Sequence, residues 1–196
     1  MGRVFRRALA AAVFTVAPVA FGQEPSRPVF PGAGELIATQ DPPKVVPRVL
    51  DRATPANTRV VVSLGRQRAY LYVDEEVAID SPVSTGRRRG QTPTGNFTVL
   101  EKATEQSSNL HGDFVDGNGN AVRHGVSTRI DAAPSGTTFR PVPVPYFLRL
   151  DDTGLALHAG RLPGYPSADR AVRLPVDIAP LVFQRVKQGT PVKIEE

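Results

Sequence analysis

The chain has 196 residues, with 24 Lys and Arg against 19 Asp and Glu and no Cys. This length suits one domain with a sizeable core, and the lack of Cys excludes disulfides, thiolate metal sites and a Cys nucleophile. Three of the basic residues fall in the first 22 positions, which leaves 21 basic and 19 acidic residues and a net charge of +2 for the rest. So small an excess argues against nucleic acid as a partner.

Residues 1–22 have the composition of a secretory signal peptide. Three Arg lie among the first seven positions, residues 8–21 are apolar apart from Thr15 and Pro18, and Ala20–Gly22 has small residues at both ends. The apolar stretch is too short and too interrupted for a stable membrane span, although an uncleaved N-terminal anchor is the alternative. We predict cleavage after Gly22, export to the periplasm or cell envelope, and no stable membrane span afterwards.

Residues 23–57 contain seven Pro and show no sustained hydrophobic period. This composition predicts an extended linker without a core of its own. The alternative is a strap that packs on the following domain, with Val45, Val46, Val49 and Leu50 supplying the contacts.

From residue 58 the pattern becomes that of β-strands. Segments rich in β-branched and aromatic residues at 59–64, 68–73 and 77–79 are separated by short polar turns. Further strands are predicted to end at 83–86 and to cover 96–100, after a turn at 92–95. Residues 145–150 and 154–158 predict another hairpin, and 190–194 a last strand. Residues 101–140 are polar and Gly-rich, which predicts a functional lid or short strands of its own.

One helix is predicted from Asp177 to Gln188. Four apolar residues of this segment fall on one face, Asp177 is the expected N-terminal cap, and Gly189 suits the position after the last turn. The domain at 58–196 is therefore predicted to be mainly β, with one principal short helix near its C-terminus.

Several motifs of this domain resemble, in their order and spacing, the L,D-transpeptidase (YkuD-like) catalytic domain. The first half carries Gln67 to Tyr70, Ser84 to Gly86 and Thr92 to Gly95, and residues 108–113 resemble an insertion of one subgroup. The second half carries His158 to Gly160, Leu162 to Pro166, Val172 to Pro175 and residues 189–192. The resemblance implies a β-sandwich of mixed sheets and a role in peptidoglycan metabolism without a cofactor.

The resemblance places the family's Ser-His-Gly-Cys-x-Arg motif on residues 168–173, where most of the motif is replaced. Ala168 stands at the Ser, Asp169 at the His, Arg170 at the Gly and Ala171 at the nucleophilic Cys, while His158 corresponds to the upstream His. Ala171 cannot attack a carbonyl. An exposed carboxylate such as Asp169 is a poor general base, and the Arg170 cation is expected to block the approach of substrate or to change which anion binds.

The remaining candidate residues each have a structural alternative. His158 is either a retained imidazole of the site or a packed, hydrogen-bonded His. Ser167 is the hydroxyl nearest to the lost Cys but needs an aligned base. Tyr165 and Arg173 are candidate binding residues, with Arg173 expected to hold the loop through its fixed donors. His111 and His124, with the nearby Asp residues, match no metal-site spacing, so no metal is predicted.

Three functional readings follow from these residues. The first is an inactive enzyme-like protein that binds peptidoglycan stem peptides or a wall-remodelling enzyme. The second is an active transpeptidase or acyltransferase with another nucleophile, and the third is an active enzyme whose motif is hidden by a local sequence error. We favour the first, because four adjacent motif residues are replaced without a change in length.

Overall fold

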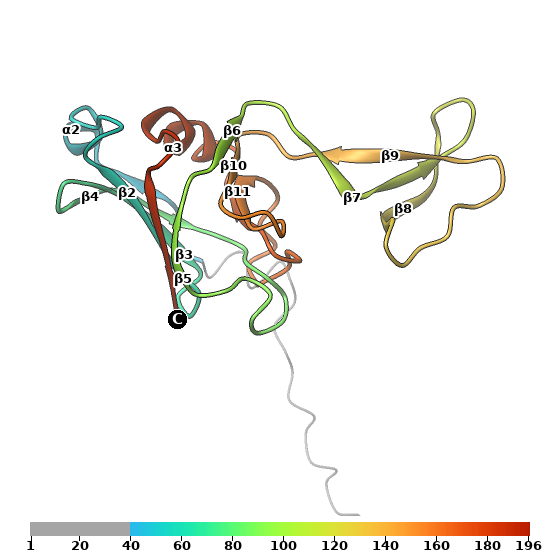
Figure 1. Ribbon diagram of the computed structural model, residues 1–196, viewed down its shortest axis with the longest axis horizontal. Helices are drawn as coiled ribbons and strands as arrows, with labels where there is room; N and C mark the ends of the chain where they lie inside the picture. Colours follow the sequence, from blue (N-terminus) through green and yellow to red (C-terminus); the bar gives the residue numbers. More distant parts are fainter. Residues whose placement is uncertain (1–39) are drawn as a thin grey trace, which may run out of the picture. The chain divides into compact units, whose positions relative to one another are not determined.

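The computed structural model describes residues 40–196, so the predicted leader and its cleavage site lie outside the described residues. Two sheets form the body of the domain (Figure 1). The six-stranded sheet has the order β1 (Lys44–Val45), β4 (Glu76–Pro82), β3 (Arg68–Val73), β2 (Thr58–Ser63), β13 (Pro191–Glu195) and β5 (Gly95–Thr98). The four-stranded sheet has the order β12 (Val172–Leu174), β11 (Ala156–Ala159), β10 (Phe147–Arg149) and β6 (Glu101–Ala103).

Both sheets are mixed. The last strand, β13, runs parallel to β2 and antiparallel to β5, and β11 runs parallel to β12 but antiparallel to β10. The mainly β fold with mixed sheets is therefore confirmed.

A single apolar core lies between these sheets. Alternate residues of β3 are buried, so Leu71 and Val73 face inward while Tyr70 and Tyr72 do not, as the period of a strand requires. Leu157 on β11 belongs to the same buried cluster. Because one cluster draws on both sheets, their inner faces pack against each other as in a sandwich.

The helix near the C-terminus, α3 (Ala179–Arg185), also packs on this core but is shorter than predicted. Its N-cap residue is Ile178, and no side chain caps it. The predicted Asp177 cap is therefore wrong, because a backbone turn supplies the acceptor instead: the amides of Ile178 and Ala179 both donate to the carbonyl of Pro175, at 3.1 and 2.9 Å.

The C-terminal end of α3 also differs from the prediction. Val186 is already extended, with φ −107° and ψ 154°. The Nζ of Lys102, on β6, donates to the carbonyl oxygens of Phe183 and Val186 at 2.7 and 2.5 Å. Gly189, with φ +84°, instead lies in the turn that leads into β13. The long-range contact from Lys102 thus ends the helix before Gln188, the last helical residue that the sequence predicts.

Part of the Pro-rich segment packs on the domain. Strand β1 pairs with β4, and the single-turn helix α2 (Pro47–Leu50) buries Val49 and Leu50, which are 2% and 6% exposed. The extended linker is therefore wrong for residues 44–50, which form the strap considered as the alternative. Burial of these apolar side chains in the core stabilises the packed segment, and the proline content of the segment alone does not reveal this contribution.

The insertion forms a third sheet. Its strand order is β8 (Ala121–Ser127), β7 (Ser107–Val115) and β9 (Thr138–Pro143). It enters from β6 and returns through β10, which are neighbours in the four-stranded sheet (Figure 1). A Cβ at Gly112 would lie 2.2 Å from the carbonyl oxygen of Arg140, so only glycine allows β7 and β9 to approach this closely. Within residues 40–196 there is no helix of the length and apolarity needed to cross a membrane.

Candidate functional site

The parallel pair β11 and β12 brings the candidate residues together. His158 is in register with Arg173, so the two side chains lie on the same face of the sheet. Ala171 immediately precedes β12, so it enters the strand that pairs with the one carrying His158. The structure thus places the position of the replaced nucleophile next to this strand pair, and its role stays a prediction.

A second segment fixes this surface from the side. The backbones of Ser84 and Arg173 exchange two hydrogen bonds of 3.1 and 2.9 Å, and the amide of Ala168 donates to the carbonyl of Thr85 at 2.9 Å. At Gly86 a Cβ would lie 2.7 Å from the Cβ of Gln91, so the close approach requires glycine. Residues 84–87 thus form a short ladder with the loop that carries the replaced motif.

The hydroxyl groups at the site are paired with one another. The Ser84 hydroxyl donates to the carbonyl of Tyr165 at 2.8 Å and lies 2.9 Å from the Ser167 hydroxyl. Because Ser84 has one proton to give, the Ser167 hydroxyl donates to Ser84, and it accepts from the Arg173 guanidinium at 3.1 Å. Ser167 therefore gives its proton to a neutral oxygen, which does not activate it as a nucleophile. The Tyr165 side chain is 40% exposed, and Tyr165 contributes its backbone carbonyl.

His158 is buried and held in one tautomer. Its Nδ1 lies 2.7 Å from the carbonyl oxygen of Ala159. A carbonyl oxygen only accepts, so Nδ1 carries the proton and Nε2 keeps a lone pair. Burial lowers the pKa of His158 and the charge of Arg173 lowers it further, against the opposing hydrogen bond to Ala159. The imidazole is therefore neutral at pH 7 and could accept a proton, but Ala171 has none to give.

Asp169 links two distant segments. One carboxylate oxygen lies 2.5 Å from the Arg87 guanidinium and the other lies 2.5 Å from Nε2 of His111. Arg87 follows the short ladder, whereas His111 lies on β7 of the inserted sheet. The insertion therefore contacts the replaced motif directly, a contact that the sequence analysis did not anticipate.

Arg170 pairs its guanidinium with an acidic side chain. Its guanidinium donates to Asp151, in the turn between β10 and β11, at 2.9 Å. Its backbone carbonyl accepts a hydrogen bond from Thr92 at 3.0 Å. The charge of Arg170 thus already has an acidic partner within the protein, while the expectation that this residue blocks substrate or selects an anion stays a prediction.

Replacing Asp151 by Asn should lower the free energy of unfolding by about 1 kcal/mol at neutral pH. Burial acts to raise the pKa of Asp151, but hydrogen bonds from Thr153, Arg170 and Leu155 outweigh it and lower the pKa to about 2. A carboxyl with a lowered folded pKa stabilises the fold above its unfolded pKa of about 3.9. That contribution disappears as the pH falls toward 2. We expect about half of the full linkage value, because solvent screens a side chain that is still 22% exposed.

The measurement is urea unfolding of both proteins from pH 7 down to pH 2. The matched control is Asp152→Asn, since the Asp152 side chain is 85% exposed and paired only with Arg149 among the described residues. This control should change stability by less than about 0.5 kcal/mol. Equal losses in the two variants would contradict the role given to Asp151.

The remaining candidates lie away from the site. His124 and Arg140 both lie 3.3 Å from Asp113, and Asp116 accepts backbone hydrogen bonds in its own turn. No group of three His, Asp or Glu side chains within residues 40–196 is arranged to hold a metal ion.

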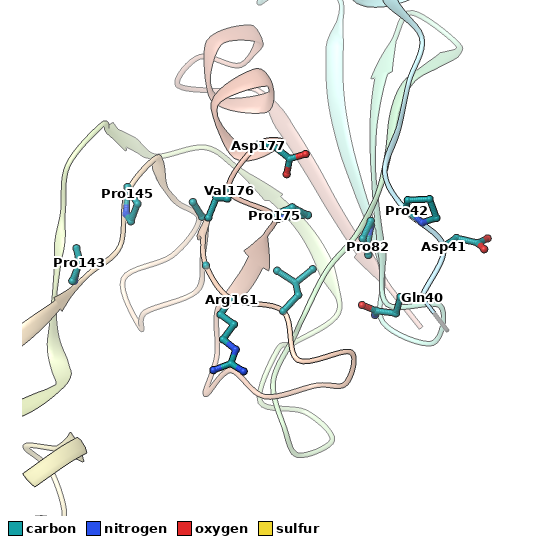
Figure 2. A pocket seen from close by; sticks show the side chains of 13 residues that line it. Gln40, Asp41, Pro42, Pro82, Pro143, Pro145, Arg161, Pro175, Val176 and Asp177 are labelled. Carbon is teal, nitrogen blue, oxygen red and sulfur yellow. The ribbon is translucent and has the colours of Figure 1, made fainter. Parts of the chain in front are cut away.

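A groove begins where β11 ends. It has a volume of about 730 Å³ and is lined by Ala159, Gly160, Arg161 and Leu162, which directly follow His158, and by several prolines (Figure 2). Figure 2 shows Pro42 and Pro82 on the right of the view, Pro145 on the left and Pro175 between them. Its walls are therefore mainly apolar and rigid, which suits an extended chain or a flat ring. Ala171 and Asp169 do not line it.

Comparison with known proteins identifies the fold. The family model of the L,D-transpeptidase catalytic domain matches residues 57–194. Solved structures include an L,D-transpeptidase from Mycobacterium smegmatis, with 19% identity and a TM-score of 0.55 over 71% of this chain and 59% of that chain. A Cys-to-Ser variant of Enterococcus faecium L,D-transpeptidase has 25% identity and a TM-score of 0.51 over 70% of this chain and 49% of that one.

A third structure is L,D-transpeptidase 3 from Mycobacterium tuberculosis with a faropenem-derived adduct. It shows 18% identity and a TM-score of 0.55 over 71% of this chain and 60% of its own length. The chain thus spans about half to three fifths of these structures, and no curated protein matches it in sequence. Because the family model covers residues 57–194 and the sheets agree, the resemblance seen in the sequence is confirmed. The chain belongs to the L,D-transpeptidase catalytic domain family.

Proposed function

We propose that this chain is a catalytically inactive member of its family, which is exported to the cell envelope and binds peptidoglycan. One observation carries the proposal: Ala171 stands directly before β12, the strand that pairs with β11 and its buried His158. Covalent acyl transfer needs a nucleophile whose proton the base removes. The methyl group of Ala171 has no such proton, so the first chemical step has no starting point at this position.

The contacts of Ser167 speak against a substitute nucleophile. Its hydroxyl lies between Ser84 and Arg173, and none of its hydrogen bonds involves His158. A serine needs an aligned base to attack a carbonyl.

A sequence error is disfavoured by the partners of the replaced residues. Asp169 lies against Arg87 and His111, and Arg170 lies against Asp151. Each side chain thus meets an oppositely charged or titratable group, which supports the sequence as written.

The retained architecture supports binding. Two isolated β-bridges join residues 84–87 to residues 168–173, and a mainly apolar groove starts at the end of β11. Peptidoglycan is the preferred ligand on family grounds, and a wall-remodelling enzyme is the alternative partner. Export rests on the basic and apolar pattern of residues 1–22. N-terminal sequencing of protein from an envelope fraction tests it, and intact Met1 protein in the cytoplasm would refute it.

Purified sacculi should co-sediment with the wild-type chain, and Leu162→Glu should weaken this binding by about tenfold, since a charge in an apolar groove costs about 1.4 kcal/mol or more. The matched control is Ile130→Glu, because Ile130 is 82% exposed and lies in the inserted sheet's loop. We expect this control to bind as wild type does. If the wild type stays in the supernatant but is crosslinked to a wall enzyme in vivo, the protein binds a wall-remodelling enzyme and the proposal of peptidoglycan binding is wrong.

A further inference from the structure

The Asp169 carboxylate is surrounded by positive groups from three segments. Arg87 and His111 contact its two oxygens, each at 2.5 Å. Arg173 is close enough for the charge of Asp169 to raise its pKa, although burial and the charge of Arg87 act more strongly and lower it. The Asp169 carboxylate therefore interacts with two permanent cations, Arg87 and Arg173, and with His111, which is cationic when protonated.

Arg173 has guanidinium donors beyond the one that contacts Ser167. Its aliphatic stem packs along Gly160, and its guanidinium makes a hydrogen bond to Ser167. Within the described part of the chain it forms no ion pair. A guanidinium has five donors in a planar fork that fits an anion in two-point fashion. A partly buried cation of this kind is most stable when an anion joins it.

We propose that Arg87, His111 and Arg173 form a binding site for a ligand carboxylate, and that Asp169 occupies this site in the free protein as an intramolecular substitute. The proposal rests on the proposed function, since it names the chemical group that the inactive site recognises. A bound carboxylate would stand beside the face that carries His158, where Arg173 offers its free donors.

Asp169 is suited to be displaced. Its side chain is 42% exposed, and those of Arg87 and His111 are 54% and 38% exposed. Ion pairs with this much solvent contact are typically worth about 0–1 kcal/mol. A ligand carboxylate that pairs with the more buried Arg173 gains a less screened interaction. Exchange of one carboxylate for another is therefore favourable while the local charge stays balanced.

Calorimetric titration with acetyl-alanyl-alanine and with its C-terminal amide tests the proposal. The two peptides differ in one charge, so the acid should bind at least about tenfold more tightly than the amide. Asp169→Asn keeps the shape and removes the competing charge, so it should tighten binding of the acid several-fold. Arg173→Gln should abolish the preference for the acid. The matched control is Arg89→Gln, an exposed Arg in the neighbouring turn, which should bind as wild type does.

Equal affinity for acid and amide, or weaker binding of the acid by Asp169→Asn, would overturn the proposal. Tighter binding of inorganic phosphate than of the acid would overturn the choice of carboxylate. If circular dichroism shows that a variant is unfolded, the wild type alone tests the proposal. Its preference for the acid over the amide must then decrease at high salt, because salt screens the interaction between charges. Sacculus binding separates the two hypotheses. Unchanged sacculus binding by a folded Arg173→Gln would sink only this inference, whereas absent wild-type sacculus binding with a retained acid preference would sink only the proposed function.

Discussion

Changing Asp169, Arg170 and Ala171 to His, Gly and Cys should let the protein form a covalent adduct with a tetrapeptide donor, which we expect the unmodified chain not to form. The new thiol would stand at the start of the strand paired with the one that carries His158, whose Nε2 lone pair is able to take a proton. Removing the nucleophile of a comparable acyl-transfer site costs about 10⁶-fold in kcat, so its return should have the largest effect of any change described above.

Mass spectrometry of the protein and release of the terminal D-amino acid measure this gain. Ala171→Cys alone should recover little, because the negative charge of Asp169 opposes ionisation of a neighbouring thiol and Arg87 offsets it only in part. The control is the triple variant with His158→Ala added, which should lose the adduct. Turnover by the unmodified chain that disappears in Ser167→Ala would instead establish the hydroxyl-nucleophile alternative.

Truncating Leu157 to Ala should lower the free energy of unfolding by about 2–5 kcal/mol. Leu157 has no exposed surface and lies in the centre of the four-stranded sheet, in register with Leu148 and Val172. Loss of its side chain leaves a cavity that neighbouring strands cannot fill without breaking their pairing. It also loosens the strand that carries His158, so ligand binding should weaken together with stability.

Urea unfolding followed by circular dichroism measures the loss. The matched control is Leu100→Ala, since Leu100 is 41% exposed and its removal opens no internal space. This control should cost less than about 1 kcal/mol. Similar midpoints for the two variants would show that the core does not depend on β11 in the way the burial indicates.

Local periodicity made most strands predictable. Residues 68–73 alternate between apolar and polar-tipped side chains, and that alternation is itself the signature of a half-buried strand. The limits of α3 were not predictable, because they depend on the Pro175 carbonyl and on Lys102, which reaches the helix from another strand. Such long-range contacts leave no mark in the local sequence.

The site was predictable to the extent that it follows from strand register. The shared face of His158 and Arg173 results from two adjacent strands whose motifs were visible in the sequence. The partner of Asp169 was not, because His111 lies on a strand whose pairing with both neighbours shifts register. An irregular ladder cannot be extrapolated from alternation alone, since each shift moves later side chains to the opposite face.

The shared carboxylate of Asp169 makes the site and the inserted sheet thermodynamically linked. A ligand that displaces Asp169 also breaks the contact between Asp169 and His111 on β7. It therefore changes the free energy with which a partner binds to β7. Such coupling is reciprocal. If a partner protein binds the inserted sheet and separates His111 from Asp169, it changes the affinity of the site for a carboxylate by some factor. Binding of the carboxylate then changes the affinity of the partner protein by the same factor. In the inactive protein that we propose, this contact would make occupancy of the site detectable at the inserted sheet.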